Sequence, residues 1–183
     1  MKKVCKIAGL ENVMANLNRE MSAIEGACLQ GLVNAGMEIK RDAQKLTPVV
    51  TGNLRNSAYV VGPAQVEDGA NPDFKDGDKP GLAVLLAAEH AASVAASITE
   101  CRSAAQPEVH VGYSAYYAPW VHENPRAGIT GGKSPSGRKY PEGTYSVVGQ
   151  WKFLQAAIEN NMTKLLSIVA AFARKKTRGG GKR

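Results

Sequence analysis

The stretch 46-LTPVVTGNLRNS-57 organises the chain, because it interrupts a long run of helical periodicity. Upstream of it, apolar residues recur at gaps of three and four and form one continuous stripe. The stripe consists of Leu10, Met14, Leu17, Met21, Ile24, Cys28, Leu32, Ala35, Ile39, Ala43 and Leu46. Pro48 disfavours helix at the residue before it, so the helix is predicted to end there. Such a helix would be about 55 Å long, more than a domain of this size needs, which favours an oligomer.

Three short segments beyond this helix predict β-strands. They are rich in β-branched and aromatic residues, and Gly or Pro lies at or beside their ends. The segments are 57–62, 107–114 and 144–149. They predict a small antiparallel sheet.

Two more helices are predicted, one from composition and one from periodicity. Residues 82–105 are Ala-rich and contain no Gly or Pro, whereas residues 150–175 carry another apolar stripe. The segments 63–81 and 125–143 are polar or Gly/Pro-rich and predict long loops. The fold class is therefore α+β: a long N-terminal helix and a C-terminal helix pack on a small antiparallel sheet, with an inserted Ala-rich helix and long loops.

The net charge of +7 is concentrated at the C-terminus. Six of the last ten residues are basic and none is acidic, which leaves 17 basic and 16 acidic side chains elsewhere. We expect one domain over 1–176 and a flexible basic tail over 177–183, which either aids solubility or contacts DNA or an acidic partner. The candidate contact residues are Lys133, Arg138, Lys139, Arg174, Lys175, Lys176, Arg178, Lys182 and Arg183.

The three cysteines, Cys5, Cys28 and Cys101, form neither a disulfide framework nor a zinc pattern. We expect reduced thiols, with Cys28 on the core side of the first helix. The most apolar stretch, 82–88, is too short to cross a bilayer, and the N-terminus lacks the apolar run of a signal peptide. A soluble protein made in a reducing cytoplasm, with no membrane partner, is the expectation.

No familiar catalytic pattern is present in the sequence. His122 begins no His-Glu-x-x-His zinc helix, and residues 128–134, GITGGKS, lack the spacing of a phosphate-binding loop. The acids Asp73, Asp76 and Asp78 do not have the spacing of an EF-hand. We therefore expect no enzyme activity, no catalytic or metal-ligating residues and no cofactor.

Three blocks carry a family resemblance: AQKLTPVVTGNLRNS (43–57), VHVGYSAYYAPWVHE (109–123) and WKFLQAAIE (151–159). In this order they resemble the bacteriophage head–tail joining family, whose members are neck or tail-completion proteins, also called minor capsid or minor tail proteins. The positions that match the family pattern include Pro48, Thr51, Gly52, Leu54, Arg55, Gly112, Tyr117, Ala118, Glu123, Phe153 and Leu154. The chain departs from the pattern at Val50, where the family commonly has Asp, and at Asn124, near a usual Gly. The segments 63–107 and 125–143 are insertions without a family counterpart.

The first block has a structural interpretation. Pro48 ends the helix, the Thr51 hydroxyl caps the following turn, Gly52 permits a tight backbone and Leu54 returns to the core. Arg55 is expected either to pair with Glu123 or to be exposed. A surface pair of this kind contributes about 0–1 kcal/mol.

The resemblance implies a virion structural protein that forms a ring at the head–tail junction, assembled in the host cytoplasm. Such a ring of identical subunits, six with twelve as the alternative, would use the long helix and the two long loops as interfaces. Its partners would be a head-completion, stopper or adaptor protein on one side and a tail terminator or tail-tube protein on the other. Genomic DNA would pass through the bore without sequence specificity.

Two other functions stay open from the residues alone. The first is a cytosolic protein that binds DNA non-specifically through the basic tail and the 125–143 loop. The second is a hydrolase with a site around Tyr117, His122 and Glu123.

Overall fold

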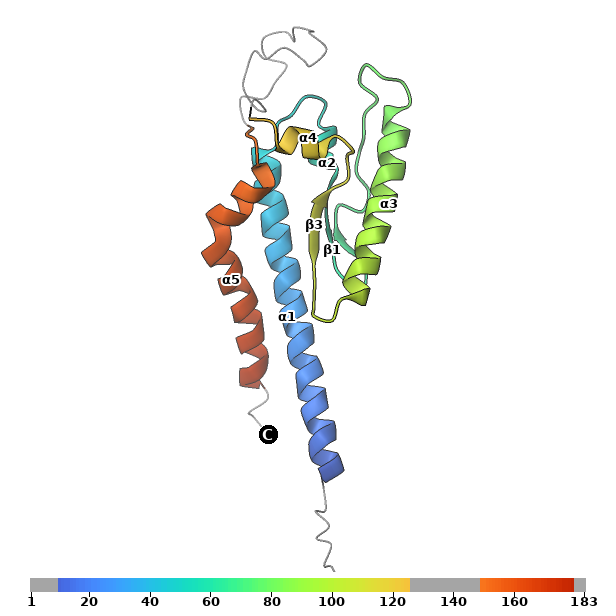
Figure 1. Cartoon of the computed structure of the whole chain (residues 1–183). Coiled ribbons are helices and arrows are strands. Elements are labelled where there is room, and N and C mark those ends of the chain that lie inside the picture. Colours follow the sequence, from blue (N-terminus) through green and yellow to red (C-terminus); the bar gives the residue numbers. More distant parts are fainter. Residues whose placement is uncertain (1–9, 126–148, 180–183) are drawn as a thin grey trace, which may run out of the picture.

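The computed structural model describes the backbone of residues 10–125 and 149–179 and the side chains of 11–125 and 149–176. Its helices are α1 (Leu10–Leu46), α2 (Asn53–Asn56), α3 (Leu82–Ser103), α4 (Ala118–His122) and α5 (Phe153–Gly179). Its strands are β1 (Ala58–Val61), β2 (Val66–Asp68) and β3 (His110–Tyr113). α1 lies between α5 and the sheet, and α3 covers the opposite face of the sheet (Figure 1). The predicted α+β fold is confirmed.

α1 begins at Leu10 and ends at Leu46, as the periodicity predicts. At its end the buried Thr47 donates a hydrogen bond of 2.7 Å to the carbonyl of Ala43, which closes the last turn. The first turns of α1 extend past the ends of α5, α3 and the sheet (Figure 1). The helix is therefore longer than the body on which it packs.

α5 runs antiparallel to α1 and packs along it, starting beside the C-terminal end of α1. The N–H of Gln150 donates to the carbonyl of Leu46 at 2.9 Å, and Lys164 pairs with Glu38 at 3.0 Å. Further along, a Cβ placed on Gly31 would lie 3.0 Å from the Cα of Val169. Gly31 thus permits a close approach between helices of the same chain.

The sheet has the strand order β2-β1-β3, and both strand pairs are antiparallel. Val60 of β1 is paired with Val111 of β3, and a Cβ on Gly36 of α1 would lie 3.1 to 3.2 Å from these two side chains. Tyr59 and Val61 point to the other face and pack against α3. Alternate residues of β1 therefore join the two helices, one on each face.

The third strand of the sheet lies at a different place from the one predicted. The third strand of the sheet is β2, inside 63–81, where a loop was predicted, so that prediction was wrong. β2 is a short polar edge strand that pairs through its backbone, so it carries no apolar alternation to signal it. The strand predicted at 144–149 and the loop predicted at 125–143 lie almost wholly outside the described residues, and Gly149 is not in a strand.

The inserted segment 63–107 contributes to the core, and the helix at the chain end is longer than predicted. α3 is part of the core, because Leu86 is fully buried in one cluster with Leu54 and Phe153. At the other end, α5 continues to Gly179, so the first residues of the predicted tail have a helical backbone.

Candidate functional site

The three sequence blocks of the family resemblance meet at one end of the molecule. Leu54 of the first block, Ala118 of the second and Phe153 of the third belong to one buried cluster, together with Leu86 and Ala115. The partly buried residues packed against it are Leu46, Phe74, Leu82, Tyr113, Tyr117, Val121 and Leu154. Five of the eleven motif positions, with at least one from each block, therefore belong to a shared core, which we call the motif cluster.

The turn after α1 is held by hydrogen bonds to the rest of the motif cluster. The Thr47 hydroxyl already donates to Ala43, so it accepts from the Tyr113 hydroxyl, 2.9 Å away. Burial raises the pKa of Tyr113 to about 12. The phenol therefore stays protonated and able to donate at any physiological pH.

The first block has the predicted turn geometry. Gly52 has a φ of 88°, a left-handed conformation that favours glycine, and Leu54 is buried. The Thr51 hydroxyl accepts from the N–H of Asn53, although the distance of 3.4 Å is long. Pro48 follows the end of α1, and a Cβ on Gly149 would lie 2.7 Å from its Cα. The chain leading into the third block thus lies directly against the first.

Two asparagines of the first block have a role that the sequence analysis missed. The buried Asn53 side chain donates to the carbonyl of Lys75 at 2.7 Å and accepts from its N–H at 2.8 Å. Asn56 donates to the carbonyl of Asp73 at 2.5 Å. These bonds tie the loop between β2 and α3 to the motif turn. The only signal in the sequence was the amide side chain itself, which matches backbone groups well.

The ion pair predicted between Arg55 and Glu123 is not formed among the described residues. Glu123 instead contacts Nδ1 of its neighbour His122 at 2.7 Å, and it is largely exposed just after α4. Arg55 is half-buried near Tyr113, where its charge opposes the rise in the tyrosine pKa. Its Nε atom is buried without a hydrogen-bond partner in the structure. Glu123 is therefore paired with His122, its neighbour in sequence, and not with Arg55.

His90 links α3 to two other parts of the body. Its Nε2 donates to the carbonyl of Gly69 and its Nδ1 accepts from the Ser114 hydroxyl, both at 2.8 Å. Burial lowers the pKa of His90, which favours the neutral imidazole that these bonds require. His90 and Ser114 are only 3% and 7% exposed. The contact between His90 and Ser114 is therefore structural, since a substrate has no access to the serine hydroxyl.

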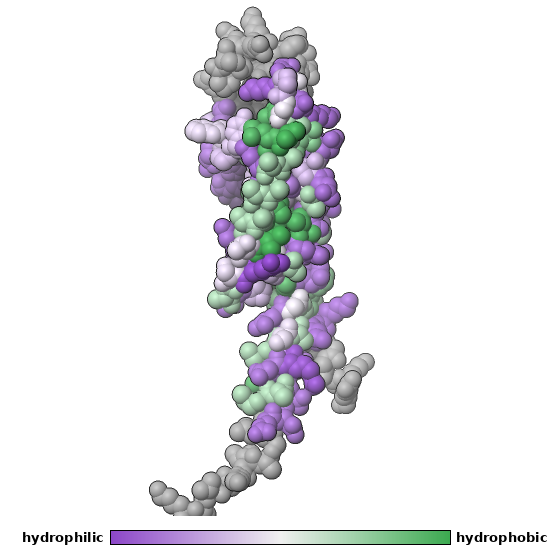
Figure 2. All heavy atoms as spheres, turned by 90° about the vertical axis from the view of Figure 1, so that its right-hand side faces the viewer, coloured by the Kyte–Doolittle hydropathy of each residue, from purple (hydrophilic) through white to green (hydrophobic). Residues whose placement is uncertain are grey.

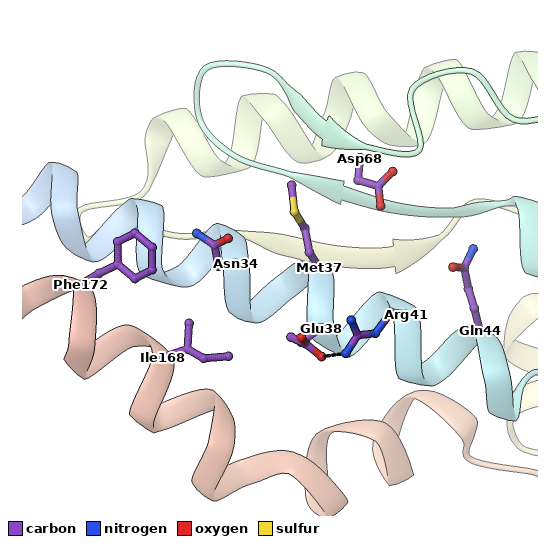
Figure 3. Close-up of a pocket in the computed structure, with 8 residues that line it drawn as sticks. All are labelled: Asn34, Met37, Glu38, Arg41, Gln44, Asp68, Ile168 and Phe172. Carbon is purple, nitrogen blue, oxygen red and sulfur yellow. Dashed lines mark hydrogen bonds and ion pairs between the residues drawn. The ribbon is translucent and has the colours of Figure 1, made fainter.

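A cavity of about 550 Å³ lies along α1, between α5 and β2 (Figure 3). It is lined by Asn34, Met37, Glu38, Arg41, Gln44, Asp68, Ile168 and Phe172. Its charged groups are already paired: Glu38 with Arg41 and Lys164, and Asp68 with Lys40. Among the described residues, no group of three or more His, Cys, Asp or Glu side chains could hold a metal ion. The cavity therefore offers no unpaired charge to a ligand.

Exposed large apolar side chains surround the motif cluster. Trp120 is 78% exposed and Tyr116 is 51% exposed, both from the second block. Val50 of the first block and Trp151 of the third are 48% and 43% exposed. Exposed aromatic residues are typical of protein-binding surfaces. Each block thus contributes both a buried residue and an exposed apolar one.

The predicted basic contact residues are only partly within the described chain. Arg174, Lys175 and Lys176 are exposed in the last turns of α5. Arg178 lies in the helical backbone beyond the described side chains. The others, Lys133, Arg138, Lys139, Lys182 and Arg183, lie outside the described residues.

The apolar stretch in α3 extends well beyond residues 82–88, the segment predicted to be too short to cross a bilayer. Over the described part of the chain, α3 is the one helix that is long and apolar enough to cross a membrane by length and composition, and 22% of the relevant window is buried. Its inner face, however, carries the buried His90 and Ser97, which bond to Gly69 and Tyr59. These bonds hold α3 against the sheet.

Comparison with known proteins gives no further guide, since no family model, curated protein or solved structure matches the chain.

Proposed function

We propose that the chain is a structural virion protein of a tailed bacteriophage, forming a homo-oligomeric ring at the head–tail junction. The ring would join the DNA-filled head to the tail and let the genome pass through its bore. It would contact a head-completion, stopper or adaptor protein on one side and a tail terminator or tail-tube protein on the other. Its function would be binding rather than catalysis.

The observation that supports this proposal is the meeting of the three motif blocks. The blocks are separated by roughly fifty and thirty residues in the sequence, yet Leu54, Ala118 and Phe153 share one buried cluster. A chance similarity of turn sequences gives no reason for these residues to pack together. The exposed aromatic residues around the cluster support a protein-binding role for this end of the molecule.

The test is to measure the mass of the purified protein alone and after mixing with the candidate tail-tube and head-stopper proteins. A closed ring, or a monomer that forms rings only with those partners, is the expected result. We further expect Trp120→Ala to weaken partner binding at least tenfold without unfolding the protein, because its side chain is 78% exposed. Leu166→Ala, at an exposed position on α5, is the matched control.

The alternative function is non-specific DNA binding through the exposed basic end of α5. It predicts a monomer that ignores both phage proteins and binds duplex DNA with an affinity that falls steeply as salt is added. Lys175→Ala combined with Lys176→Ala would then reduce the affinity, whereas Trp120→Ala would not. These two results together would support DNA binding and contradict the head–tail proposal.

A further inference from the structure

Two apolar surfaces of this chain have no partner among the described residues. The first lies on the N-terminal segment of α1, residues 11–30, whose first turns extend past the body (Figure 1) and whose later residues, such as Ala27 and Cys28, are half-buried. Val13 is 62% exposed, and Met14, Leu17 and Met21 are each about half exposed. From Met14 through Cys28 the apolar residues alternate strictly at gaps of three and four. That spacing is typical of a coiled-coil seam, which packs against another helix.

The second surface is the outer face of α3. Val84 and Leu85 are 75% and 50% exposed, and most of the other exposed residues of this helix are alanines. This face consists of Val84, Leu85, Ala87, Ala88, Ala91, Ala92, Ala95, Ala96 and Thr99, none of which is charged. Figure 2 views the molecule from this side and shows an apolar band along it. A continuous apolar band of this length on a protein surface marks an interaction site.

These two surfaces do not meet within one chain, because α1 and α3 lie on opposite faces of the sheet and the outer face of α3 is turned away from both (Figure 1). We propose that the N-terminal segment of α1 in one copy packs along the outer face of α3 in the next copy. A single type of contact would then cover both apolar surfaces. The inference rests on the proposed function only for the role of the resulting ring at the head–tail junction. The contact itself can be tested on the purified chain alone.

The two surfaces fit each other in length and in side-chain size. Residues 11–22, which are all exposed, form about 18 Å of helix, and α3, about 33 Å long, is long enough to receive them. Met14, Leu17 and Met21 are long side chains, whereas Ala88, Ala91 and Ala95 leave shallow spaces between them. Long side chains from one helix can insert between the alanines of another, which lets the two helices approach closely.

Charge disfavours the simplest alternative, in which two copies pair through α1 alone. The positions that flank the seam carry Glu11, Glu20 and Glu25, and the single basic residue, Arg19, lies on the far side. Two such segments side by side would place glutamates against glutamates, which repels. The outer face of α3 is uncharged from Val84 to Thr99, so the same glutamates could remain at the rim in water.

The proposed contact joins two different patches, so it is heterologous. Each copy would donate its α1 segment to one neighbour and receive the segment of another neighbour on α3. Association through such patches continues from copy to copy, and it gives a closed ring where the rotation between copies closes and an open filament where it does not.

The test uses two full-length variants and their mixture. Leu17→Glu with Met21→Glu disables the α1 segment, and Ala91→Glu disables the outer face of α3. All three positions are exposed, so each variant should fold with the circular dichroism spectrum of the wild type. We expect the wild type to form oligomers whose mass rises with concentration, and each variant alone to be monomeric by light scattering.

The mixture is the decisive sample. One variant retains an intact α3 face and the other retains an intact α1 segment, so the two should form a dimer of one copy of each and nothing larger. Ser22→Glu adds a charge to α1 away from the seam, and Ala91→Ser keeps the residue at position 91 small. Both controls should associate like the wild type.

Several outcomes would overturn the inference. One is a wild type that stays monomeric through the micromolar range. Others are an Ala91→Glu variant that still dimerises, as pairing through α1 alone requires, and variants that fail to combine when mixed. Binding of the wild type to phosphatidylcholine vesicles, lost in Ala91→Glu, would assign the outer face of α3 to a membrane instead.

The result is separable from the fate of the proposed function. Self-association that follows the pattern above, in a protein that ignores tail-tube and head-stopper proteins, would keep this contact and discard the head–tail proposal. Rings that form on those partners and are unaffected by Ala91→Glu would do the opposite.

Discussion

The two halves of α1 share one apolar periodicity but differ in environment. In residues 31–46, Val33, Ala35 and Ala43 are at most 6% exposed, enclosed by α5 and the sheet. In residues 11–30, Met14, Leu17 and Met21 remain half exposed. Apolar periodicity therefore predicts a helix and the direction of its apolar side. It does not predict whether residues of the same chain cover that side.

The packed half of α1 has small residues where it approaches its neighbours most closely, although its stripe also includes Leu32, Ile39 and Leu46. The packed half contains Gly31, Ala35, Gly36 and Ala43, and backbone or valine side chains lie within 3.0–3.3 Å of where a Cβ on either glycine would be. The projecting half presents long, flexible Met and Leu side chains instead. Small residues suit a close contact inside a rigid body, whereas long ones suit insertion into a partner.

The largest effect is expected where the three motif blocks meet. Phe153 is 1% exposed and its ring contacts those of Tyr113 and His122, with centroids 5.0 Å apart in each pair. Phe153→Ala should lower the free energy of unfolding by about 3–5 kcal/mol, because it removes a buried ring and leaves a cavity. Leu17→Ala, in the projecting half, should change it by less than about 0.5 kcal/mol in dilute solution. Urea denaturation checks both values, and equal effects would contradict the comparison.

A smaller effect is expected from filling the contact between α1 and the sheet. Gly36→Leu places a large side chain where a Cβ alone would lie 3.1–3.3 Å from Val60, Val109 and Val111. We expect a loss of about 1–3 kcal/mol from overpacking. A midpoint of urea denaturation that equals that of the wild type would show that the sheet can move away from α1.

The pH dependence of stability tests the tie that holds α3 on the sheet. Burial lowers the pKa of His90 from the ordinary value of 6.5, so below that pH the unfolded chain binds a proton that the folded chain resists. The free energy of unfolding should therefore fall as the pH drops from about 6.5 to 5. His90→Gln should remove this slope and cost about 1–3 kcal/mol at neutral pH, because the two buried bonds of 2.8 Å from the imidazole to Ser114 and Gly69 are lost and the Ser114 hydroxyl keeps only the Ser57 carbonyl, 3.3 Å away.

The effect of His90 on the pH dependence of the free energy of unfolding can be separated from the effect of the acidic residues. The hydrogen bond from Lys45 lowers the pKa of Asp42 below its ordinary value of 3.8, so the contribution of Asp42 is lost only as the pH falls below that value. Identical slopes between pH 6.5 and 5 in the wild type and in His90→Gln would contradict the role given to His90.

Much of the fold could be predicted from the sequence because its signals are local. The ends of α1 followed from apolar spacing and from Pro48, and β1 and β3 followed from β-branched residues between turn signals. β2 was missed because an edge strand bonds through its backbone, whatever its side chains. Packing of α3 on the sheet depends on contacts between distant segments, which neither composition nor spacing specifies.

The candidate site was predictable to a different extent. The sequence identified the motif blocks, and Leu54, Ala118 and Phe153 proved to be neighbours. The bonds from Asn53 to Lys75 could not be foreseen, since they depend on where a polar loop crosses the turn. Arg55 was expected either to pair with Glu123 or to be exposed, and in the described structure it does neither, since it is half-buried and forms no pair with Glu123. A pattern of charges does not show which neighbour lies nearer.

A gain in stability is expected at Gly26 in the projecting half. A Cβ at this position would meet nothing within 4 Å, in contrast to Gly31 and Gly36. Gly26→Ala should therefore raise the free energy of unfolding by about 0.5–1 kcal/mol, because alanine loses less backbone entropy in a helix. Gly31→Ala is the matched change in the same helix and should give less, since the backbone of Val169 lies 3.0 Å from the new Cβ. A gain at Gly31 equal to that at Gly26 would mean that α5 yields freely, and the packed half of α1 would then be no more rigidly enclosed than the projecting half.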